Sequence, residues 1–414
     1  MTHLTPAIHK KEAFFKVKNQ SVPKGAQGKS RTYSSVFTLR IVNFTSHRKL
    51  LSTAAAALAL SAVALPASAT NWWNATPPQT IGSTVLDVRS FGASGNGSTD
   101  DTAAIQAAVD ALPSSGGTIV VPDGTYMINA TKGISLRSHT RLSLSSSTYL
   151  KAIPNSSDRY WVVKIWKADN VEIVGGHIIG ERYQHRGTYG QWGYCVNVSG
   201  SSNVYLHNVS LSDSWGDGIL VGGLGWGKDM VPSYKVTLNG VSATGNRRQG
   251  MSITPANQVY IVNSSFTSSK GNAPQAGVDI EPQTQGDVSQ VRLENTTLSD
   301  NAGNGLEVHN RVNGVSLYKV TAENNKGFGV YTGDPTNITI QSSTLSQNWL
   351  FGVSISAYTS HVKIFDNTIN YNGDAWFYAH GVSIFSKGWA PRDISIADTA
   401  SYVTQYNNTV SPMK

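Results

Sequence analysis

Seven short segments of this chain share one pattern, in which a glycine precedes an apolar residue, a variable residue and usually a second apolar residue. A strand-sized segment that returns every 23–32 residues is typical of a solenoid, in which each repeat stacks on the next. Residues that are far apart in the sequence then become neighbours in space. The glycines of the pattern are Gly218, Gly250, Gly277, Gly305, Gly329, Gly352 and Gly381.

A second apolar alternation accompanies these segments, and many repeats add a third short apolar stretch after Asn or Ser. Alternation with a period of two predicts strands that bury one face. Three strands in each of about nine or more coils predict an all-β chain folded as a parallel β-helix. The helix is expected to be right-handed, because connections between parallel strands of one sheet are right-handed. The second strands are expected at residues 170–173, 203–206, 235–238, 258–261, 290–293, 314–317, 337–340, 361–364 and 393–396.

The N-terminal side of the repeats predicts a capping α-helix. Ser98-Thr99-Asp100-Asp101 is a helix-start signal, and Ile105, Ala108, Val109 and Leu112 follow with helical spacing. Residues 117–121 then predict the first strand, and residues 122–126 a turn. A solenoid needs such a cap because its end coil has no neighbour.

The residues around this helix resemble a known family. Phe91-Gly92-Ala93, Gly95-Asn96-Gly97 and Val121-Pro122-Asp123-Gly124-Thr125-Tyr126, together with the helix, are similar to the N-terminal cap of pectin-lyase-like (pectate lyase superfamily) β-helix proteins. The resemblance implies a polysaccharide lyase, a polygalacturonase-like hydrolase or a tailspike-like depolymerase. It does not choose among them, because one fold hosts several chemistries.

Charge and composition separate a leader from this fold. The chain carries +8 formally, but residues 1–69 hold ten of its 33 Lys and Arg and one of its 25 acids. The remainder is therefore near neutral, which argues against nucleic acid as a partner. A basic stretch, an apolar run and Ala67-Ser68-Ala69 predict a signal peptide at about 47–69 and a secreted or periplasmic protein with no membrane contact after cleavage.

We therefore divide the chain into an extended leader with its signal (1–69), a linker (70–83) and a β-helix domain (84–414). Its one cysteine, Cys195, excludes an intrachain disulfide and is expected to be structural.

The repeat arranges outward-facing residues in columns, because positions +1 and +3 after the glycine are apolar and point inward. In two adjacent repeats the outward positions are Asp279, Glu281, Glu307 and His309. We expect these side chains in one patch, since neighbouring strands lie ~4.8 Å apart. Asp217, at the turn before its glycine, joins the patch.

Crowded carboxylates either raise one another's pKa, which suits a general acid, or bind a cation. Asp279, Glu281 and Glu307 are therefore candidate ligands for Ca²⁺, and no other cofactor is indicated. The alternative is a solvated acidic face without a function.

Lengthened coils supply candidate walls for a substrate site. These loops mix aromatic residues, which suit sugar rings, with Arg and Lys, which suit carboxylates. The candidate substrate-binding residues are Arg182, Tyr183, His185, Tyr189, Trp192, Tyr194, Trp226, Arg247 and Tyr331.

Three reactions on an acidic, uronate-containing polysaccharide remain open, and β-elimination is preferred. It needs a cation that neutralises the substrate carboxylate, such as Arg247, Arg248 or a bound metal. It also needs a base that removes the C5 proton, such as Lys228, Tyr194 or His309. Hydrolysis would pair Asp279 with Glu281 or Glu307. Asp217 resembles one element of polygalacturonases, whose paired aspartates are replaced here by Arg248-Gln249.

The third reaction is C5-epimerisation. Glu307-Val308-His309 resembles part of the mannuronan C5-epimerase motif, whose full Asp-Pro-His is absent. A glycan-binding β-helix without catalysis is the non-enzymatic alternative.

Overall fold

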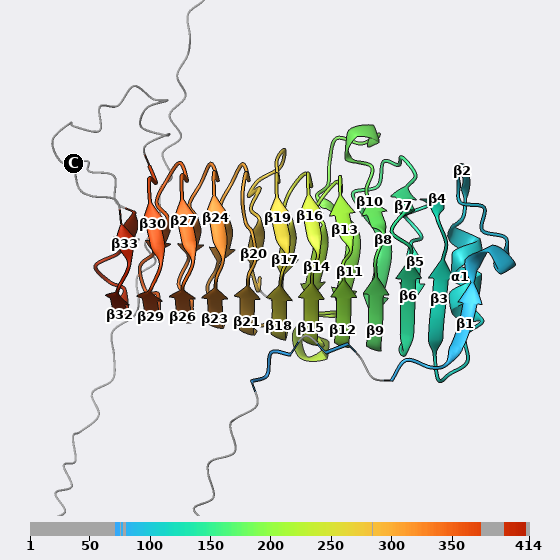
Figure 1. Ribbon diagram of the computed structural model, residues 1–414, viewed down its shortest axis with the longest axis horizontal. Coiled ribbons are helices and arrows are strands. Elements are labelled where there is room, and N and C mark those ends of the chain that lie inside the picture. The colour runs from blue at the N-terminus through green and yellow to red at the C-terminus, as the bar shows by residue number, and fades with distance from the viewer. Residues whose placement is uncertain (1–70, 75, 78–79, 284, 374–392, 411–414) are drawn as a thin grey trace, which may run out of the picture. The chain divides into compact units, whose positions relative to one another are not determined.

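The computed structural model describes residues 71–74, 76–77, 80–283, 285–373 and 393–410 (Figure 1). The predicted leader and signal peptide, and the repeat at Gly381, lie outside the described residues. The described part belongs to one compact unit, Ala67–Lys414. It is a parallel β-helix, so the predicted fold class is confirmed.

Strands from successive coils form three parallel faces, and the expectation of three strands per coil is confirmed. Sheet A is the longest face. Its strands in spatial order are β1 (Thr84–Asp87), β3 (Gly117–Val121), β6 (Thr140–Leu144), β9 (Asp169–Val174), β12 (Ser202–His207), β15 (Ser233–Asn239), β18 (Ala256–Val262), β21 (Val288–Glu294), β23 (Val312–Tyr318), β26 (Thr336–Gln341), β29 (Ser360–Phe365) and β32 (Ser401–Tyr406).

Sheet B is the second face and consists of two sheets in line. Its strands are β2 (Asn96–Asp100), β4 (Gly124–Ile128), β7 (Thr148–Ala152), β10 (His177–Ile179), β13 (Ser210–Ser212), β16 (Ser242–Thr244) and β19 (Ser265–Thr267), then β24 (Thr321–Glu323), β27 (Thr344–Ser346), β30 (Thr368–Asn370) and β33 (Thr409–Val410).

Sheet C is the third face, and it carries the glycine-led segments. Its strands are β5 (Ile134–Leu136), β8 (Arg159–Trp166), β11 (Trp192–Ser199), β14 (Ile219–Gly222), β17 (Met251–Ile253), β20 (Val278–Ile280), β22 (Leu306–Val308), β25 (Val330–Thr332), β28 (Val353–Ile355) and β31 (Ile394–Ile396).

The core is a stack of apolar side chains that repeat from coil to coil. On sheet A, Val204, Val236, Val259 and Val291 pair in register and are at most 1% exposed. β-Branched side chains suit this position because they pack well against the same residue type in the next strand.

A ladder of buried asparagines runs through the turns of the C-terminal coils. Asn301 donates to Asn325 at 3.0 Å, Asn325 to Asn348 at 2.9 Å, and Asn348 to Asn372 at 2.9 Å. The side-chain oxygen of each accepting asparagine also accepts a hydrogen bond from the backbone N–H of the preceding asparagine in the ladder. The ladder thus satisfies polar groups that would be costly to bury alone.

One strand prediction is wrong. Residues 393–396 were expected to continue the second-strand face, but β31 pairs with β28 in sheet C. Sheet A instead continues with β32, which pairs with β29. Both faces use the same apolar alternation, so the pattern alone does not tell them apart. At the other end, β1 precedes the strand predicted as the first, and the predicted turn runs into β4.

Helix α1 (Thr102–Asp110) begins where the start signal predicts, and its buried face includes Ile105, Ala108 and Val109. The short 3₁₀ helix η1 (Val88–Phe91) precedes it. Asp101 accepts hydrogen bonds from the backbone of Ser94 and Gly95, which fixes the loop before α1. Figure 1 shows α1 beside the first coils; its capping role stays a prediction.

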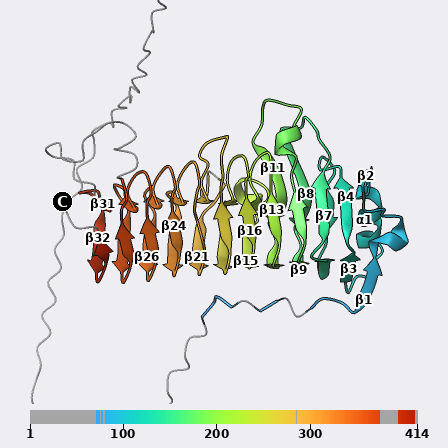
Figure 2. The same cartoon turned by 45° about the horizontal axis from the view of Figure 1, so that its top comes forward.

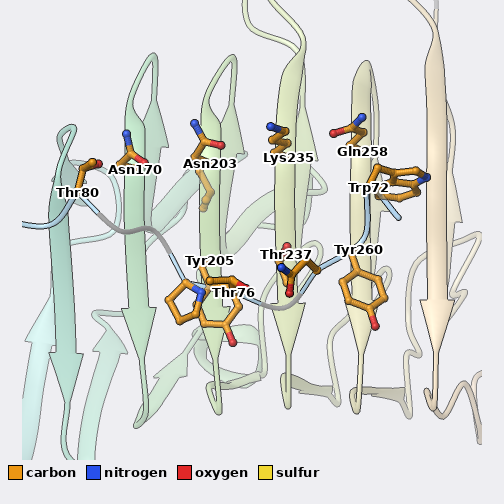
Figure 3. Close-up of a pocket in the computed structure, with 13 residues that line it drawn as sticks. Trp72, Thr76, Thr80, Asn170, Asn203, Tyr205, Lys235, Thr237, Gln258 and Tyr260 are labelled. Carbon is orange, nitrogen blue, oxygen red and sulfur yellow. The ribbon is translucent and has the colours of Figure 1, made fainter. Parts of the chain in front are cut away.

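Trp72, Thr76 and Thr80 of the predicted linker lie along the outer face of sheet A (Figure 3). Trp73 stacks on the Arg292 guanidinium at 4.6 Å, and the Thr80 carbonyl is 2.9 Å from His139 Nδ1. Between these points, residues such as Trp72 and Tyr260 line a cavity of about 360 Å³. The segment therefore bridges several coils. Among the described residues, no helix combines the length and apolar character needed to cross a bilayer.

Candidate functional site

A cleft of about 430 Å³ lies over the outer face of sheet C. Strands β8 and β11, the loop after β14 and the residues after β20 form it. Figure 2 shows the long loop before β11, which contains η2 (Arg182–Gln184), standing out from the row of shorter turns. The cleft is lined by Arg159, Trp161, Trp166, Gln191, Trp192, Tyr194, Asn197, Ser199, Leu220, Gly223, Leu224, Gly225, Trp226, Arg248, Ser252, Thr254, Glu281, Gln283 and Gln285.

One column of outward-facing residues connects the cleft with the predicted acidic patch. Strand pairing in sheet C places each member beside the next, so the column follows the stacking direction of the coils. In order, the members are Lys164, Asn197, Leu220, Ser252, Asp279, Glu307 and Tyr331.

The N-terminal end of the cleft combines indole rings with cations. Arg159 lies 5.0 Å from the ring centre of Trp192, and Lys164 Nζ lies 5.5 and 5.3 Å from the rings of Trp161 and Trp166. The rings of Trp161 and Trp166 meet edge to face at 4.8 Å. This end therefore offers both apolar faces and positive charge to a ligand.

The other end of the cleft contains a buried ion pair. Arg248 Nη1 lies 3.1 Å from Asp217 Oδ2, and Arg248 Nη2 lies 3.7 Å from Glu281 Oε2. Ser252 donates to the same Asp217 oxygen at 2.7 Å. Arg248 can reach both carboxylates because Asp217 and Arg248 come from neighbouring coils at the turn before sheet C.

Burial controls protonation in this network. Burial raises the pKa of Asp217 to about 6, although Arg248 and the Ser252 hydroxyl oppose the shift. Burial also raises the pKa of the Tyr194 hydroxyl, and the charge of Asp217 adds to this. Tyr194 therefore carries its proton at neutral pH and is a weaker acid than a free tyrosine.

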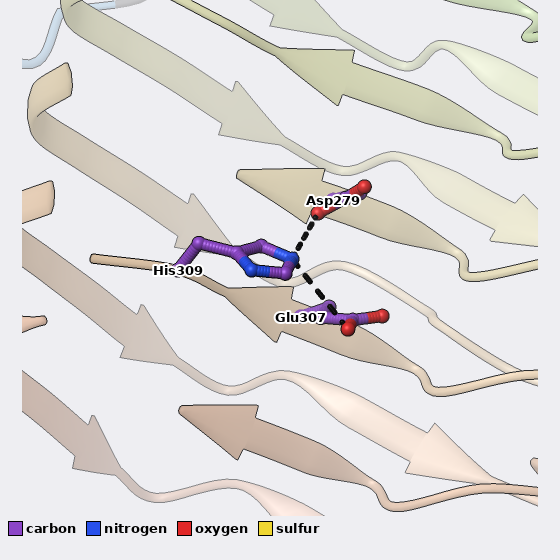
Figure 4. A group of neighbouring side chains, drawn as sticks. All are labelled: Asp279, Glu307 and His309. Carbon is purple, nitrogen blue, oxygen red and sulfur yellow. Dashed lines mark ion pairs between the residues drawn. The ribbon is translucent and has the colours of Figure 1, made fainter. Parts of the chain in front are cut away.

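Beyond the ion pair, three side chains from two adjacent strands converge (Figure 4). His309 Nε2 lies 3.2 Å from Asp279 Oδ1 and 3.5 Å from Glu307 Oε1. One ligand atom from each residue lies within 4.8 Å of the other two. Asp279 also accepts from Gln249, and Glu307 accepts from Asn304 at 3.2 Å.

The charges in this group shift the pKa values of the neighbouring side chains. Burial raises the pKa of Glu307, and the negative charge of Asp279 raises it further. Burial alone would lower the pKa of His309, but its contact with Asp279 and the charge of Glu307 outweigh that effect, so the pKa is raised.

The expected patch is present, but it is not a solvated acidic face. Asp217 and Asp279 are 0% and 1% exposed, whereas Glu307, Glu281 and His309 keep 14, 34 and 32% of their side chains exposed. The two aspartates therefore hold other side chains in place, and the remaining three can meet a ligand.

The calcium prediction needs a correction. Glu281 turns toward Arg248 after β20 ends at Ile280, and it is not part of the convergent group. Among the described residues, the group able to share a cation is Asp279, Glu307 and His309.

Several predicted site residues do not line the cleft. Lys228, in the 3₁₀ helix η3 (Gly227–Asp229), is exposed beside the cleft-lining Trp226 but is not itself part of the lining. Tyr183 and Tyr189 are 77 and 81% exposed and also lie outside it. Tyr331 adjoins Glu307 in register and stacks on Phe328 at 5.4 Å.

Three other predicted substrate-binding residues support the wall loop instead. The ring of Trp215 is sandwiched between His185 at 3.8 Å and the Arg247 guanidinium at 3.6 Å. The His185 side chain is buried and lies 2.8 Å from Glu181. Arg182 donates to backbone carbonyls of two neighbouring coils. Trp192, Tyr194 and Trp226 do line the cleft, and their role in substrate binding stays a prediction.

The sequence reasoning missed Arg159, Trp161 and Trp166 on β8 and Asn197 on β11. In β11 and β8 the position of the usual glycine is held by Cys195 and Val162, so the glycine pattern misses both coils. Cys195 itself is buried and structural, as predicted, with its thiol 3.3 Å from the Ser212 carbonyl. The alternation at residues 163–165 and 196–198 was the available signal.

Comparisons with known proteins agree with the fold. Residues 274–410 match the family model described as a right handed beta helix region. The uncharacterized protein YclG of Bacillus subtilis (strain 168) is 28% identical over 356 residues, which cover 78% of this chain. This chain spans 59% of the length of that relative.

Solved structures show the same fold at low identity. The A-module of the Azotobacter vinelandii mannuronan C-5 epimerase AlgE4 is 19% identical with a TM-score of 0.61, covering 79% of this chain and 95% of the module. The Dettilon tailspike protein is 16% identical with a TM-score of 0.57, covering 79% of this chain and 61% of the tailspike. The chain is thus a right-handed parallel β-helix protein, and its resemblance to pectin-lyase-like proteins is confirmed at the level of fold.

Proposed function

We propose that this chain is an enzyme that acts on an acidic, uronate-containing polysaccharide by β-elimination. The observation that carries the proposal is the continuity of one face of sheet C. A cleft with indoles and cations at one end leads to Arg248, Tyr194 and Glu281 at the other, and His309 follows in the next coil, outside the lining.

The cleft suits an acidic sugar chain more than a neutral one. Flat indole faces such as those of Trp192 and Trp226 fit the apolar faces of sugar rings. Arg159 lies beside Trp192, and Lys164 lies beside Trp161 and Trp166, so both add positive charge that can pair with a carboxylate of the polymer. A neutral glycan would not use this charge.

The chemistry follows from the residues that can reach a substrate. In β-elimination a base takes the proton from C5, the electron pair forms the C4–C5 double bond, and the C4–O bond breaks. Glu281 and His309 are the accessible bases. Tyr194 is only 5% exposed but lines the cleft in its protonated form, and we assign it as the proton donor to the leaving oxygen. Arg248 is the cation placed to face the carboxylate of the reacting sugar.

Hydrolysis fits this arrangement less well. A hydrolase needs two carboxyl groups that flank the scissile bond. Each pairing expected from the sequence includes Asp279, whose side chain is almost fully buried and held by Gln249. Asp217 has the raised pKa of a general acid but is equally buried and bound to Arg248.

C5-epimerisation is the second candidate, because it begins with the same proton abstraction and then returns a proton to the other face of the ring. The structural likeness to an epimerase module and the Glu307–His309 spacing favour it.

A product assay separates these reactions. The purified chain would be incubated with alginate, polygalacturonate and bacterial exopolysaccharides. Elimination produces ultraviolet absorbance from the new double bond, whereas hydrolysis produces reducing ends without that absorbance. Epimerisation produces neither but changes the uronate composition measured by NMR. Binding without any product would replace the enzyme proposal with a glycan-binding module.

We also propose that the chain is exported, on the basis of the leader at 1–69. Sequencing the N-terminus of protein recovered outside the cytoplasm tests this proposal. A mature start near Thr70 supports it, and retention of the leader in the cytoplasm contradicts it.

A further inference from the structure

Asp279, Glu307 and His309 each direct one possible metal-ligand atom toward the same point. Its three facing atoms are Asp279 Oδ1, Glu307 Oε1 and His309 Nε2, all within 4.8 Å of one another (Figure 4). The two contacts to the imidazole nitrogen are 3.2 and 3.5 Å long. Ligands on a small cation with bonds of about 2.1 Å lie roughly 3.0–3.5 Å apart.

The far side of each carboxylate is already occupied. The Gln249 amide donates to the other oxygen of Asp279, and the Asn304 amide donates to the other oxygen of Glu307 at 3.2 Å. Both carboxylates are thereby oriented with one oxygen directed at His309. Outer partners of this kind orient the ligands of metal sites.

The directed oxygen of Asp279 has no hydrogen-bond partner, although the side chain is only 1% exposed. His309 Nε2 lies 3.2 Å from it, a contact that becomes an ion pair when the imidazole is protonated. A buried, unpartnered carboxylate oxygen is costly. A cation between the three atoms would satisfy it.

We propose that Asp279 Oδ1, Glu307 Oε1 and His309 Nε2 bind one divalent first-row transition-metal ion of the Zn²⁺ or Mn²⁺ type. The imidazole nitrogen distinguishes this site from a calcium site, because Ca²⁺ takes six to eight oxygen ligands. Imidazole with carboxylates suits the transition metals. The proposal does not rest on the reaction assigned above.

The site is open on one side. His309 and Glu307 are 32 and 14% exposed, so water or a substrate oxygen can reach the point at which the three atoms converge. With an ion bound, His309 is a ligand, and Glu281 remains the accessible base one residue beyond β20.

Metal binding to the full chain tests the site without a substrate. After chelator treatment, the protein would be titrated with ZnCl₂, MnCl₂ and CaCl₂ by calorimetry, and with Co²⁺ by visible absorption. We expect one Zn²⁺ or Mn²⁺ per chain, weaker binding of Ca²⁺, and a Co²⁺ spectrum that changes when His309 is replaced. His309→Ala and Glu307→Gln should each weaken binding at least about tenfold. Loss of a residue that only orients a ligand already costs about 10–100-fold in metal affinity, and loss of a ligand itself costs at least as much.

Glu281→Gln is the matched control, because Glu281 is a neighbouring carboxylate outside the group. Its affinity should fall far less than that of the ligand variants, because only a neighbouring charge is lost. Circular dichroism confirms folding, and His309→Gln replaces His309→Ala if the latter does not fold. The proposal is overturned if no ion binds, if Ca²⁺ binds most tightly, if His309 variants bind normally, or if Glu281→Gln loses the ion as well.

Discussion

Asp217 Oδ2 and Arg248 Nη1 lie 3.1 Å apart beneath the cleft, with side-chain exposures of 0 and 12%. Two charges withdrawn from water to this degree depend on each other, because removing one leaves the other buried and unpaired. The pair also holds Arg248 where it can contact Glu281 and line the cleft.

Replacing Arg248 should therefore affect stability and activity together. Arg248→Ala leaves the Asp217 carboxylate uncompensated, and we expect a loss of about 3–5 kcal/mol in the free energy of unfolding. Urea denaturation measures the loss. Arg248→Ala with Asp217→Asn removes both charges and should recover much of the stability but none of the activity. If the double variant is as unstable as Arg248→Ala, the unpaired charge of Asp217 is not the cause of the stability loss.

The raised pKa of Asp217 predicts a pH-dependent stability. Its pKa is about 6 in the fold against 3.8 for the free side chain. The contribution of Asp217 is therefore fully present below pH 3.8 and is lost as pH rises through 6, in total about 3 kcal/mol. Asp217→Asn does not titrate. The difference in unfolding free energy between the unaltered chain and this variant should fall by about 2.4 kcal/mol from pH 4 to pH 7, and parallel curves would contradict the shift.

The indole end of the cleft should govern substrate binding rather than chemistry. Trp192→Ala removes a ring that stacks with Arg159, and we expect KM to rise about fivefold to tenfold with kcat little changed, equivalent to about 1 kcal/mol of aromatic contact. Steady-state kinetics on the polysaccharide identified by the product assay measures this. Tyr183→Ala, at an exposed aromatic residue outside the cleft, is the control. Equal effects of the two substitutions would remove the cleft from the binding site.

The asparagine ladder predicts a stability effect far from the site. Asn348→Ala removes a link between Asn325 and Asn372 and leaves buried backbone groups unsatisfied, at a cost of about 1–3 kcal/mol. Asn313, which accepts one hydrogen bond at an exposed position, is the matched residue, and Asn313→Ala should change the unfolding free energy little. Thermal or urea unfolding compares them, and a neutral Asn348→Ala would mean that water replaces the ladder.

Much of the fold could be predicted because each coil repeats one physical constraint. Inward positions must be apolar in every coil, so the glycine-led pattern located β14, β17, β20, β22, β25 and β28 directly. The failure at residues 393–396 arose where an insertion separates two strands, since alternation gives a strand but not its sheet.

The site was predictable only where it follows the repeat. Asp279 and Glu307 share one column, His309 lies two residues beyond Glu307, and their convergence follows from strand spacing. The direction taken by Glu281 depends on Arg248, which lies at a turn whose conformation the pattern does not determine. The roles of His185 and Arg247 depend on Trp215, a contact between loops that no periodicity encodes.

For a polysaccharide bound along the coils, as proposed, the columns of sheet C would act as a molecular ruler. From β8 to β22 the sheet advances by five strands, about 24 Å at ~4.8 Å per strand. Each advance is close to the length of one sugar ring, so a polysaccharide lying along the coils meets the protein in steps of one ring. The stacking of the backbone would then set the number of subsites, and a single inserted coil would lengthen the bound chain by one sugar.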